Sequence, residues 1–244
     1  MRLDLYLSEN GFCDSRSKAQ TVIQSGRVSV NDSVITKASF DVKNNDIVSV
    51  AESNQTEFVG RGGNKLEHTF SVFDYSAQNK ICLDIGASTG GFTQCLLMHG
   101  AKCVYAVDSG RDQLAKTLLT DERVVSIEGF NARSLTSETL DGNLMDLVVM
   151  DVSFISQRLL YPAILRVAKK GADVITLIKP QFEVGKQYIG KKGIVKDVKI
   201  KKRIIQEIIE SATEIGFEYV AHTESPITGG DGNQEFLLHL KVKS

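Results

Sequence analysis

The sequence predicts an α/β fold in which a mostly parallel sheet carries helices on both faces, preceded by a small α+β domain. From about residue 80 onward, short apolar runs typical of strands alternate with helical patterns. A polar stretch at 51–57 separates this region from a compact first segment. The 244 residues are 42% hydrophobic, which excludes a disordered chain. We therefore expect two domains, at residues 1–58 and 59–244.

The first domain is expected to contain a helix followed by short strands. Ser15 suits the N-cap of a helix that ends before Gly26, and Ala19, Val22 and Ile23 form its apolar side. Strand-like runs follow at 28–30, 34–35 and 47–50, with turns at 31–32 and 44–46.

The second domain is expected to alternate strands with helices. A short helix near 64–73 precedes strands near 80–85, 102–107, 124–128, 146–151 and 173–178. Helical patterns lie near 91–99, 111–119, 156–168 and 197–215. Two further runs, 218–222 and 235–242, end the chain, and the alternation in the last suits an antiparallel pair at the sheet edge.

The chain carries none of the usual signs of export or membrane insertion. Charges interrupt the first residues, MRLDLYLSENG, so they do not form a signal peptide. The longest apolar runs are far shorter than a membrane span. The four cysteines, Cys13, Cys82, Cys95 and Cys103, show neither metal-ligand nor redox spacing. We expect a cytoplasmic protein with no structural disulfide and no metal.

Charge is distributed unevenly along the chain. The formal net charge is only −1, which by itself argues against nucleic-acid binding. Residues 179–203, however, carry nine basic and two acidic side chains, whereas residues 204–244 carry two basic and seven acidic ones. The near-zero total therefore hides a basic stretch, whose ordinary interpretation is a solvated helix face.

A glycine-rich turn, Asp84-Ile-Gly86-Ala-Ser-Thr-Gly90-Gly91, joins a predicted strand to a predicted helix. Such a turn lets the backbone approach a ligand beside the electropositive end of the helix. Its spacing does not match the dinucleotide fingerprint, and Phe92 stands where a Walker loop needs lysine. A second near-match at 185–191 also fails, because Lys192 replaces the required serine or threonine.

The remaining pattern, D-x-G-x-x-x-G, resembles the loop with which methyltransferases hold S-adenosylmethionine. The resemblance implies that Asp84 lies near the amino group of the cofactor, and that the backbone from Gly86 to Gly90 skirts the sulfonium. Asp108 ends the next strand, where a carboxylate can accept both ribose hydroxyls. The third strand ends near Asn131, which offers polar groups to the adenine. The expected cofactor-binding residues are Asp84, Gly86, Ala87, Ser88, Thr89, Gly90, Asp108 and Asn131.

The whole chain resembles one family. Residues 1–50 are similar to the S-four (S4) RNA-binding domain, and residues 58–244 to FtsJ-like ribose 2′-O-methyltransferases. This order, with FVGRGGNKL at the junction, resembles the TlyA family, whose members are often called hemolysins. The resemblance implies a Rossmann-like S-adenosylmethionine methyltransferase sheet. It also implies methylation of cytidine 2′-oxygens in ribosomal RNA.

The family's catalytic set, Lys-Asp-Lys-Glu, corresponds to Lys65, Asp151, Lys179 and Glu235. Three of these lie at ends of strand-like runs, where open α/β sheets bind ligands. A ribose 2′-hydroxyl is a poor nucleophile and must be oriented and deprotonated. We expect Lys179 to do this. Taken singly, each residue also has an ordinary interpretation, such as a helix cap for Asp151 or a solvated lysine at Lys65.

Basic and aromatic residues provide the candidate RNA contacts. In the second domain Phe154 is expected either to stack on the target base or to pack in the core. We expect Lys191 and Lys192 to meet phosphates from a loop beside the active site, and part of the helix after them to be solvated. The first domain offers Arg2, Arg16, Lys18 and Arg27, with salt-bridged surface residues as the alternative.

Three functions compete for this sequence. The first is an S-adenosylmethionine-dependent RNA methyltransferase, acting as a monomer on ribosomal RNA or ribosomal subunits. The second is a ribosome assembly factor with a vestigial methyltransferase fold, which the intact Lys-Asp-Lys-Glu set disfavours. The third is a membrane-lytic protein, which lacks an export signal, a spanning segment and a strongly amphipathic cationic helix rich in aromatics.

Overall fold

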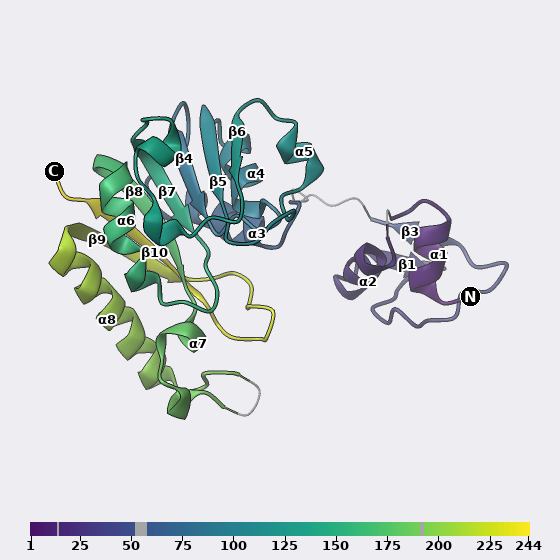
Figure 1. Cartoon of the computed structure of the whole chain (residues 1–244). Coiled ribbons are helices and arrows are strands. Elements are labelled where there is room, and N and C mark those ends of the chain that lie inside the picture. The colour runs from purple at the N-terminus through teal and green to yellow at the C-terminus, as the bar shows by residue number, and fades with distance from the viewer. Residues whose placement is uncertain (14, 52–57, 191–192) are drawn as a thin grey trace. The chain divides into compact units, whose positions relative to one another are not determined.

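The chain forms two compact units, Met1–Glu57 and Phe58–Ser244 (Figure 1). The computed structural model describes residues 1–13, 15–51, 58–190 and 193–244. The division falls one residue before the boundary expected from the sequence, because Phe58 packs against the hydrophobic core of the second unit. Each unit has a core of its own.

The first unit packs two helices against a three-stranded antiparallel sheet. Its helices are α1 (Leu3–Glu9) and α2 (Arg16–Gln24), and its strands are β1 (Val28–Val30), β2 (Ser33–Val34) and β3 (Val48–Val50), in the order β2-β1-β3. Ser15 caps α2 by accepting a hydrogen bond from the backbone N–H of Lys18, as the sequence predicts. Leu3, Leu7 and Ile23 are completely buried between the layers.

The second unit is built on a seven-stranded sheet in the order β6-β5-β4-β7-β8-β10-β9. The first five strands in this order run parallel, and β10 pairs antiparallel with both β8 and β9. This confirms the expected α/β class with an antiparallel edge. The strands are β4 (Ile81–Ile85), β5 (Cys103–Val107), β6 (Val124–Ile127), β7 (Met145–Met150), β8 (Ala168–Ile178), β9 (Phe217–Glu224) and β10 (Phe236–Val242).

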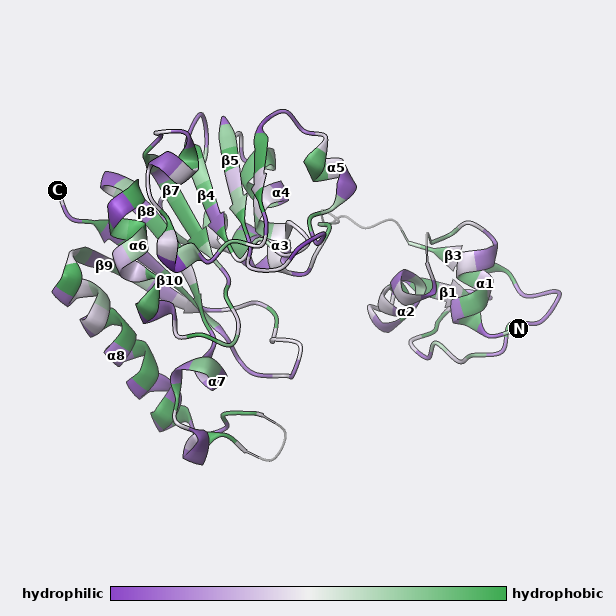
Figure 2. Ribbon diagram, in the orientation of Figure 1, coloured by the Kyte–Doolittle hydropathy of each residue, from purple (hydrophilic) through white to green (hydrophobic). Residues whose placement is uncertain are grey.

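Helices cover both faces of this sheet. Alternate residues of one strand enter different cores: Cys82 of β4 packs with residues from α3 and α4, whereas Leu83 packs with residues from α6 and α8. The central strands β4 and β7 are accordingly mostly apolar on both sides, as their green colour in Figure 2 shows. The helices are α3 (Gly62–Val72), α4 (Gly91–Met98), α5 (Lys116–Leu119), α6 (Tyr161–Val167), α7 (Pro180–Glu183) and α8 (Val198–Ile215).

Two predicted helices are shorter than the sequence suggests. Of the pattern at 111–119, only α5 is α-helical, because the Glu128 carboxylate accepts hydrogen bonds from the backbone N–H groups of Asp112, Gln113 and Leu114. Those groups are therefore bound by a side chain instead of by helical carbonyls. The pattern at 156–168 divides into a 3₁₀ turn, Gln157–Leu159, and α6, which has a proline in its first turn.

Candidate active site

Four charged side chains meet at the carboxyl edge of the large sheet. Asp151 directly follows β7 and Lys179 directly follows β8, so two neighbouring parallel strands bring them to the same edge. Glu235 immediately precedes β10, whose first residue lies beside the end of β8. Lys65 reaches the same place from the first turn of α3. The topology thus gathers residues that are up to 170 positions apart in the sequence.

These side chains form a continuous chain of ion pairs. Lys65 Nζ lies 2.6 Å from Glu235 Oε2 and 3.9 Å from Asp151 Oδ2. Lys179 Nζ lies 2.5 Å from Asp151 Oδ1 and donates a hydrogen bond of 2.8 Å to Ser153 Oγ. Asp151 is therefore shared by both lysines, and the four formal charges cancel.

The pair formed by Lys65 and Glu235 is nearly inaccessible to water. Their side chains are 9% and 3% exposed, respectively. A charge at such a position requires a partner, because burial removes its hydration. Removal of either side chain would leave the other charge buried and uncompensated. The loop after β9 also lies close, since a Cβ atom at Gly229 would stand 2.5 Å from Glu235 Oε1.

Glycines shape the turn between β4 and α4. Gly86 has a φ of +84°, and a Cβ atom there would lie 2.4 Å from the backbone oxygen of Asp151. The missing side chain therefore lets the ends of β4 and β7 approach each other. Gly90 has a φ of +95°, and its Cβ atom would lie 2.2 Å from Leu118 Cδ1 of α5. Gly90 is thus required by helix packing.

Asp84 lies beneath this turn and is completely buried. Its Oδ2 atom accepts a hydrogen bond of 2.7 Å from the Thr93 hydroxyl, whereas its Oδ1 atom has no hydrogen-bond partner. Burial raises the pKa of Asp84 to about 7, although the bond from Thr93 acts in the opposite direction. The placement differs from the sequence expectation of contact with a cofactor, because Asp84 lines neither cavity described below.

Two adjoining cavities open at this edge, with volumes of about 290 Å³ and 710 Å³. The smaller contains the four charged side chains and the turn at 86–89. The larger contains Asp108, Asn131 and Phe154. Of the predicted cofactor-binding residues, only Asp84 and Gly90 lie outside both. Residues shared by the two cavities are Gly86, Ser88, Asp151 and Ser153.

The Asp108 carboxylate is fixed in place at the larger cavity. Its Oδ2 atom accepts a hydrogen bond of 2.8 Å from the backbone N–H of Ser88, and its Oδ1 atom one of 2.7 Å from that of Gly110. Each carboxylate oxygen can accept a further hydrogen bond. Asp108 therefore ties the glycine turn to the end of β5 and can still bind hydroxyl groups of a ligand.

Phe154 is exposed at the rim of the larger cavity. Its side chain is 91% exposed, so the alternative that it packs in the core is wrong. Its φ is +65°, a conformation that bulky residues rarely adopt. Its ring lies 5.0 Å from that of Phe182 on α7, and Glu183 of the same helix accepts a hydrogen bond of 2.6 Å from Ser156. Phe154 thus pairs with an aromatic ring that lies three residues after Lys179 in the sequence.

Three residues of this region are missing from the sequence prediction. Arg61 and Ser153 line the smaller cavity, and Phe182 pairs with Phe154. The glycines on both sides of Arg61 are a sequence signal for this residue, because glycine lets the backbone come close to a ligand. Ser153 lies two residues after Asp151, and Phe182 lies three residues after Lys179. Their closeness to predicted catalytic positions is the sequence signal for them.

In the first unit, two of the predicted RNA-binding arginines converge on one buried carboxylate. Arg2 Nε lies 3.0 Å and Arg16 Nε 2.9 Å from Asp4, which has no exposed surface. Hydrogen bonds from Arg2, Gln20 and Arg16 hold the pKa of Asp4 well below its usual range, against the effect of burial. Both arginine side chains nevertheless remain nearly half exposed. Lys18 also has an interaction partner, and Arg27 donates to the Ala51 carbonyl.

The basic stretch leads into α8. Arg203 lies over the ring of Tyr188 at 4.9 Å and pairs with Glu207, while Lys196, Lys199 and Lys202 are exposed. These exposed lysines agree with a partly solvated helix. Lys191 and Lys192 lie outside the described residues.

The remaining sequence expectations concern membranes and cysteines. Within the ranges that the structure describes, no helix is both long and apolar enough to cross a membrane. Cys82, Cys95 and Cys103 are free thiols.

Comparison with known proteins identifies both units. The family of FtsJ-like methyltransferases matches residues 58–242, and the S4 domain matches residues 1–48. Hemolysin A of Brachyspira hyodysenteriae is 45% identical over 99% of this chain and 100% of its own length. The 16S/23S rRNA (cytidine-2′-O)-methyltransferase TlyA of Mycobacterium tuberculosis is 39% identical over 100% of this chain and 90% of its own length.

A solved structure has the same architecture. A protein from Streptococcus thermophilus, described as a hemolysin, superposes with a TM-score of 0.79 and 36% identity, covering 100% of this chain and 89% of its own. Together with the sequence matches, which extend over the whole length, this shows that the chain belongs to the TlyA family, which joins an S4 domain to an FtsJ-like methyltransferase domain.

Proposed function

We propose that the chain transfers a methyl group from S-adenosylmethionine to the 2′-oxygen of a cytidine ribose in ribosomal RNA. The observation that carries the proposal is the chain of ion pairs among Lys65, Asp151, Lys179 and Glu235, which lines the same cavity as the glycine turn. The name of the TlyA relative from Mycobacterium tuberculosis supports the nucleotide and the class of RNA. A ribosomal substrate also favours a cytoplasmic location.

The residues at the two cavities fit S-adenosylmethionine. The larger cavity, at about 710 Å³, has a volume typical of small-molecule sites. Asp108 would accept hydrogen bonds from the ribose hydroxyls, and Asn131 would contact the adenine. The backbone at 86–89 would hold the methionine end, with Asp84 supporting the turn from below. When bound, this cofactor supplies a methyl group already activated by its positively charged sulfur.

The chemical role of Lys179 is to orient and deprotonate the 2′-hydroxyl. Movement of one proton from its Nζ to Asp151, 2.5 Å away, leaves a neutral amine that can accept the hydroxyl proton. Lys179 would then hold the proton taken from the hydroxyl, and the protonated Asp151 would release one proton to water, which restores the ion pair. The hydrogen bond to Ser153 fixes the direction of the Lys179 side chain. Positioning of this kind supplies much of the acceleration in such a reaction.

Lys65 and Glu235 maintain the geometry of this proton acceptor. Lys65 lies 3.9 Å from Asp151 Oδ2, whereas Lys179 lies beside Oδ1, and Lys65 is itself held 2.6 Å from Glu235. This arrangement keeps one oxygen of Asp151 directed at each lysine. Because Glu235 is buried, water cannot substitute for it.

Contacts to RNA would come from both units. Phe154 and Phe182 offer rings on which the target base can stack, since sequence-specific proteins often stack splayed bases on aromatic side chains. Arg61, at the smaller cavity, would bind a phosphate beside the target ribose. In the first unit, Arg2, Arg16, Lys18 and Arg27 would bind RNA. Lys191 and Lys192 remain predicted phosphate contacts.

Methyl transfer to purified ribosomal subunits tests the proposal. The protein is incubated with S-adenosylmethionine labelled in the methyl group and with subunits from a strain that lacks the enzyme. We expect label in the RNA with the wild-type chain and essentially none with Lys179→Ala. Binding of S-adenosylhomocysteine is measured by calorimetry in parallel. Cofactor binding without transfer to any subunit would instead support the vestigial assembly factor.

A further inference from the structure

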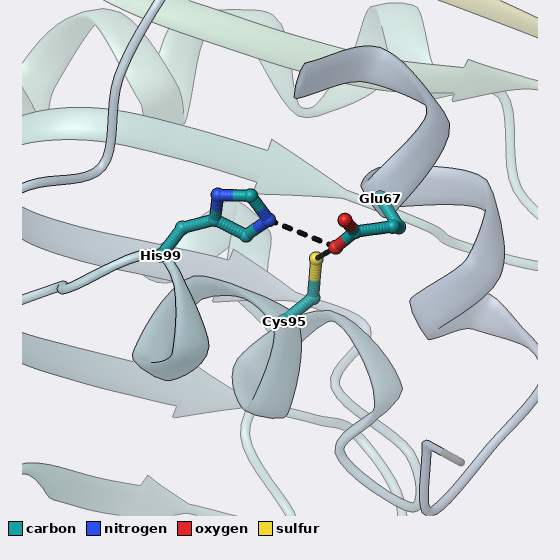
Figure 3. Close-up of side chains that lie close together, drawn as sticks. All are labelled: Glu67, Cys95 and His99. Atoms are coloured by element: carbon teal, nitrogen blue, oxygen red, sulfur yellow. Dashed lines mark hydrogen bonds and ion pairs between the residues drawn. The ribbon is translucent and has the colours of Figure 1, made fainter. Parts of the chain in front are cut away.

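A second group of polar side chains lies on the outer side of α3 and α4. Glu67 of α3 faces Cys95 of α4 and His99, which follows α4 by one residue (Figure 3). We refer to these three residues as the Glu67–Cys95–His99 cluster. It shares no residue with the cavities of the active site.

The donor atoms of this cluster converge on one point. His99 Nε2 lies 2.8 Å from Glu67 Oε2, and Cys95 Sγ donates a hydrogen bond of 3.5 Å to the same oxygen. All three atoms lie within 4.8 Å of one another. Cys95 and His99 are four residues apart, a spacing that places both on one side of a helix. Two helices thus bring one sulfur, one nitrogen and one oxygen together.

We propose that the Glu67–Cys95–His99 cluster binds a zinc ion that joins α3 to α4. Thiolate, imidazole and carboxylate are the ligands that Zn²⁺ takes in proteins, whereas Mg²⁺ and Ca²⁺ prefer oxygen alone. Three protein ligands would leave a fourth position for water on the exposed side of the cluster. The cysteine spacing in the sequence gives no sign of this site, because the third ligand comes from a helix 28 residues earlier.

Side-chain adjustments would convert the observed geometry into a metal site, in which the sulfur and nitrogen atoms, now within 4.8 Å of each other, would lie about 3.5 Å apart. Tetrahedral zinc, with bonds of about 2.0–2.3 Å, separates its ligand atoms by about 3.3–3.6 Å. The sulfur–oxygen distance of 3.5 Å already satisfies this. The nitrogen–oxygen distance of 2.8 Å would have to lengthen by roughly 0.6 Å. The Glu67 side chain is 46% exposed and can make this adjustment, and the His99 ring is fixed by parallel stacking on Phe70 at 3.7 Å.

Binding of zinc to the cluster would be accompanied by the loss of the thiol proton of Cys95. Burial raises the pKa of the Cys95 thiol, so this group is protonated before the metal binds. One Zn²⁺ displaces that proton, which passes to water, and forms a Zn–S bond, while the His99 nitrogen and the Glu67 oxygen complete the set of protein ligands. The thiolate and the carboxylate together neutralise the ion. This balance suits a site whose sulfur is completely buried.

A metal at this position would stabilise the helices that support the active site. Lys65 lies two residues before Glu67 on α3, and therefore on the opposite side of that helix. α4 begins at Gly91, directly after the glycine turn. An ion bound between Glu67 and Cys95 would thus hold α3 and α4 together. On α3 it would lie on the side of the helix opposite Lys65, which faces the active-site cavity.

Cobalt(II) and zinc titrations of the untagged full-length chain test the proposal. Co²⁺ is added under a phosphine reductant, and we expect a thiolate-to-cobalt absorption band together with the visible bands of a tetrahedral site. Zn²⁺ should displace the cobalt at a 1:1 ratio and abolish these bands, and zinc added to the metal-free protein should release a proton. It should also raise the midpoint of thermal unfolding.

Matched variants identify the ligands. Cys95→Ser, His99→Ala and Glu67→Gln should each weaken zinc binding, and Cys95→Ser by at least about 100-fold, because even indirect partners of a metal contribute 10–100-fold. Cys103→Ser and His222→Ala alter a cysteine and a histidine outside the cluster and should bind zinc like the wild type. Glu67→Gln concerns an exposed side chain, so its folding is not at risk.

Either of two results would overturn the proposal. One is a cobalt complex without a thiolate band. The other is zinc affinity that is the same in Cys95→Ser and in the wild type. Both would show that the contact between Glu67 and His99 is a hydrogen bond within the protein and not part of a metal site. Neither outcome depends on methyl transfer, so the proposed function is tested separately.

Discussion

At the scale of single residues, Lys179 differs from the other three residues linked by ion pairs in the active site, Lys65, Asp151 and Glu235. Lys65 is held by the buried Glu235, which favours a structural charge. Lys179 contacts Asp151 and the hydroxyl of Ser153, a residue that lines both cavities. The two lysines are therefore expected to respond differently to substitution, although both contact Asp151.

The substitution Lys179→Arg tests whether Lys179 acts as a proton acceptor or only as a positive charge. Arginine keeps the positive charge but does not lose its proton at working pH, so it cannot accept one from a hydroxyl. We expect Lys179→Arg to lower kcat by about 10²–10⁴-fold, nearly as much as Lys179→Ala. Single-turnover methyl transfer measures this. Lys169→Arg, at a lysine paired with Asp146 outside the active site, is the matched control and should keep full activity.

Asp84 should make stability depend on pH. Its pKa of about 7 in the folded chain exceeds the ordinary value, so the folded state binds the proton more strongly than the unfolded state. The contribution is therefore present below about pH 4 and is lost as pH rises through 7. We expect Asp84→Asn to reduce the decline in the free energy of unfolding between pH 5 and pH 8 by about 1–3 kcal/mol. Urea denaturation at both pH values checks this, and an unchanged decline would contradict it.

At the scale of secondary-structure elements, the turn between β4 and α4 depends on packing against α5. A Cβ atom at Gly90 would overlap Leu118 and would also require an unfavourable φ. We expect Gly90→Ala to lower the free energy of unfolding by about 2–4 kcal/mol. Gly142→Ala has a similarly positive φ but nothing within 4 Å of the new Cβ, so it should cost only about 1–2 kcal/mol. Equal losses in thermal or urea unfolding would count against the packing argument.

The sequence predicts the strands of the large sheet well because burial on both faces makes each one a distinct apolar run. The resemblance to the family supplies the four charged residues, and three of them lie at the ends of strand-like runs, which places them at a known edge of the sheet. The prediction from the sequence fails at 111–115, where the distant Glu128 carboxylate takes over the backbone N–H groups. It likewise cannot reveal that Arg2 and Arg16 meet at Asp4, because only the packing of α1 against α2 brings them together.

At the scale of the whole molecule, the basic stretch at 179–203 begins at the active site and continues into α8. The near-zero net charge of the chain therefore does not exclude binding to RNA. Each lysine that neutralises a phosphate adds to the dependence of affinity on salt.

The double variant Lys191→Ala/Lys192→Ala tests this electrostatic contribution. We expect weaker binding to ribosomal RNA and a slope of log affinity against log salt that is smaller by about 1–2. Filter binding over a range of salt concentrations provides the slope. Lys169→Ala/Lys170→Ala removes the same charge from the beginning of β8 and should leave the slope unchanged.

The proposed function is defined by the position of the transferred methyl group on the RNA. Ribosomal RNA treated with the wild-type chain is digested to nucleosides and analysed by mass spectrometry. We expect 2′-O-methylcytidine as the new product. It should be absent from ribosomal RNA treated with the Lys179→Ala variant. A methyl group on a base, or undiminished 2′-O-methylation by Lys179→Ala, would contradict the proposed function.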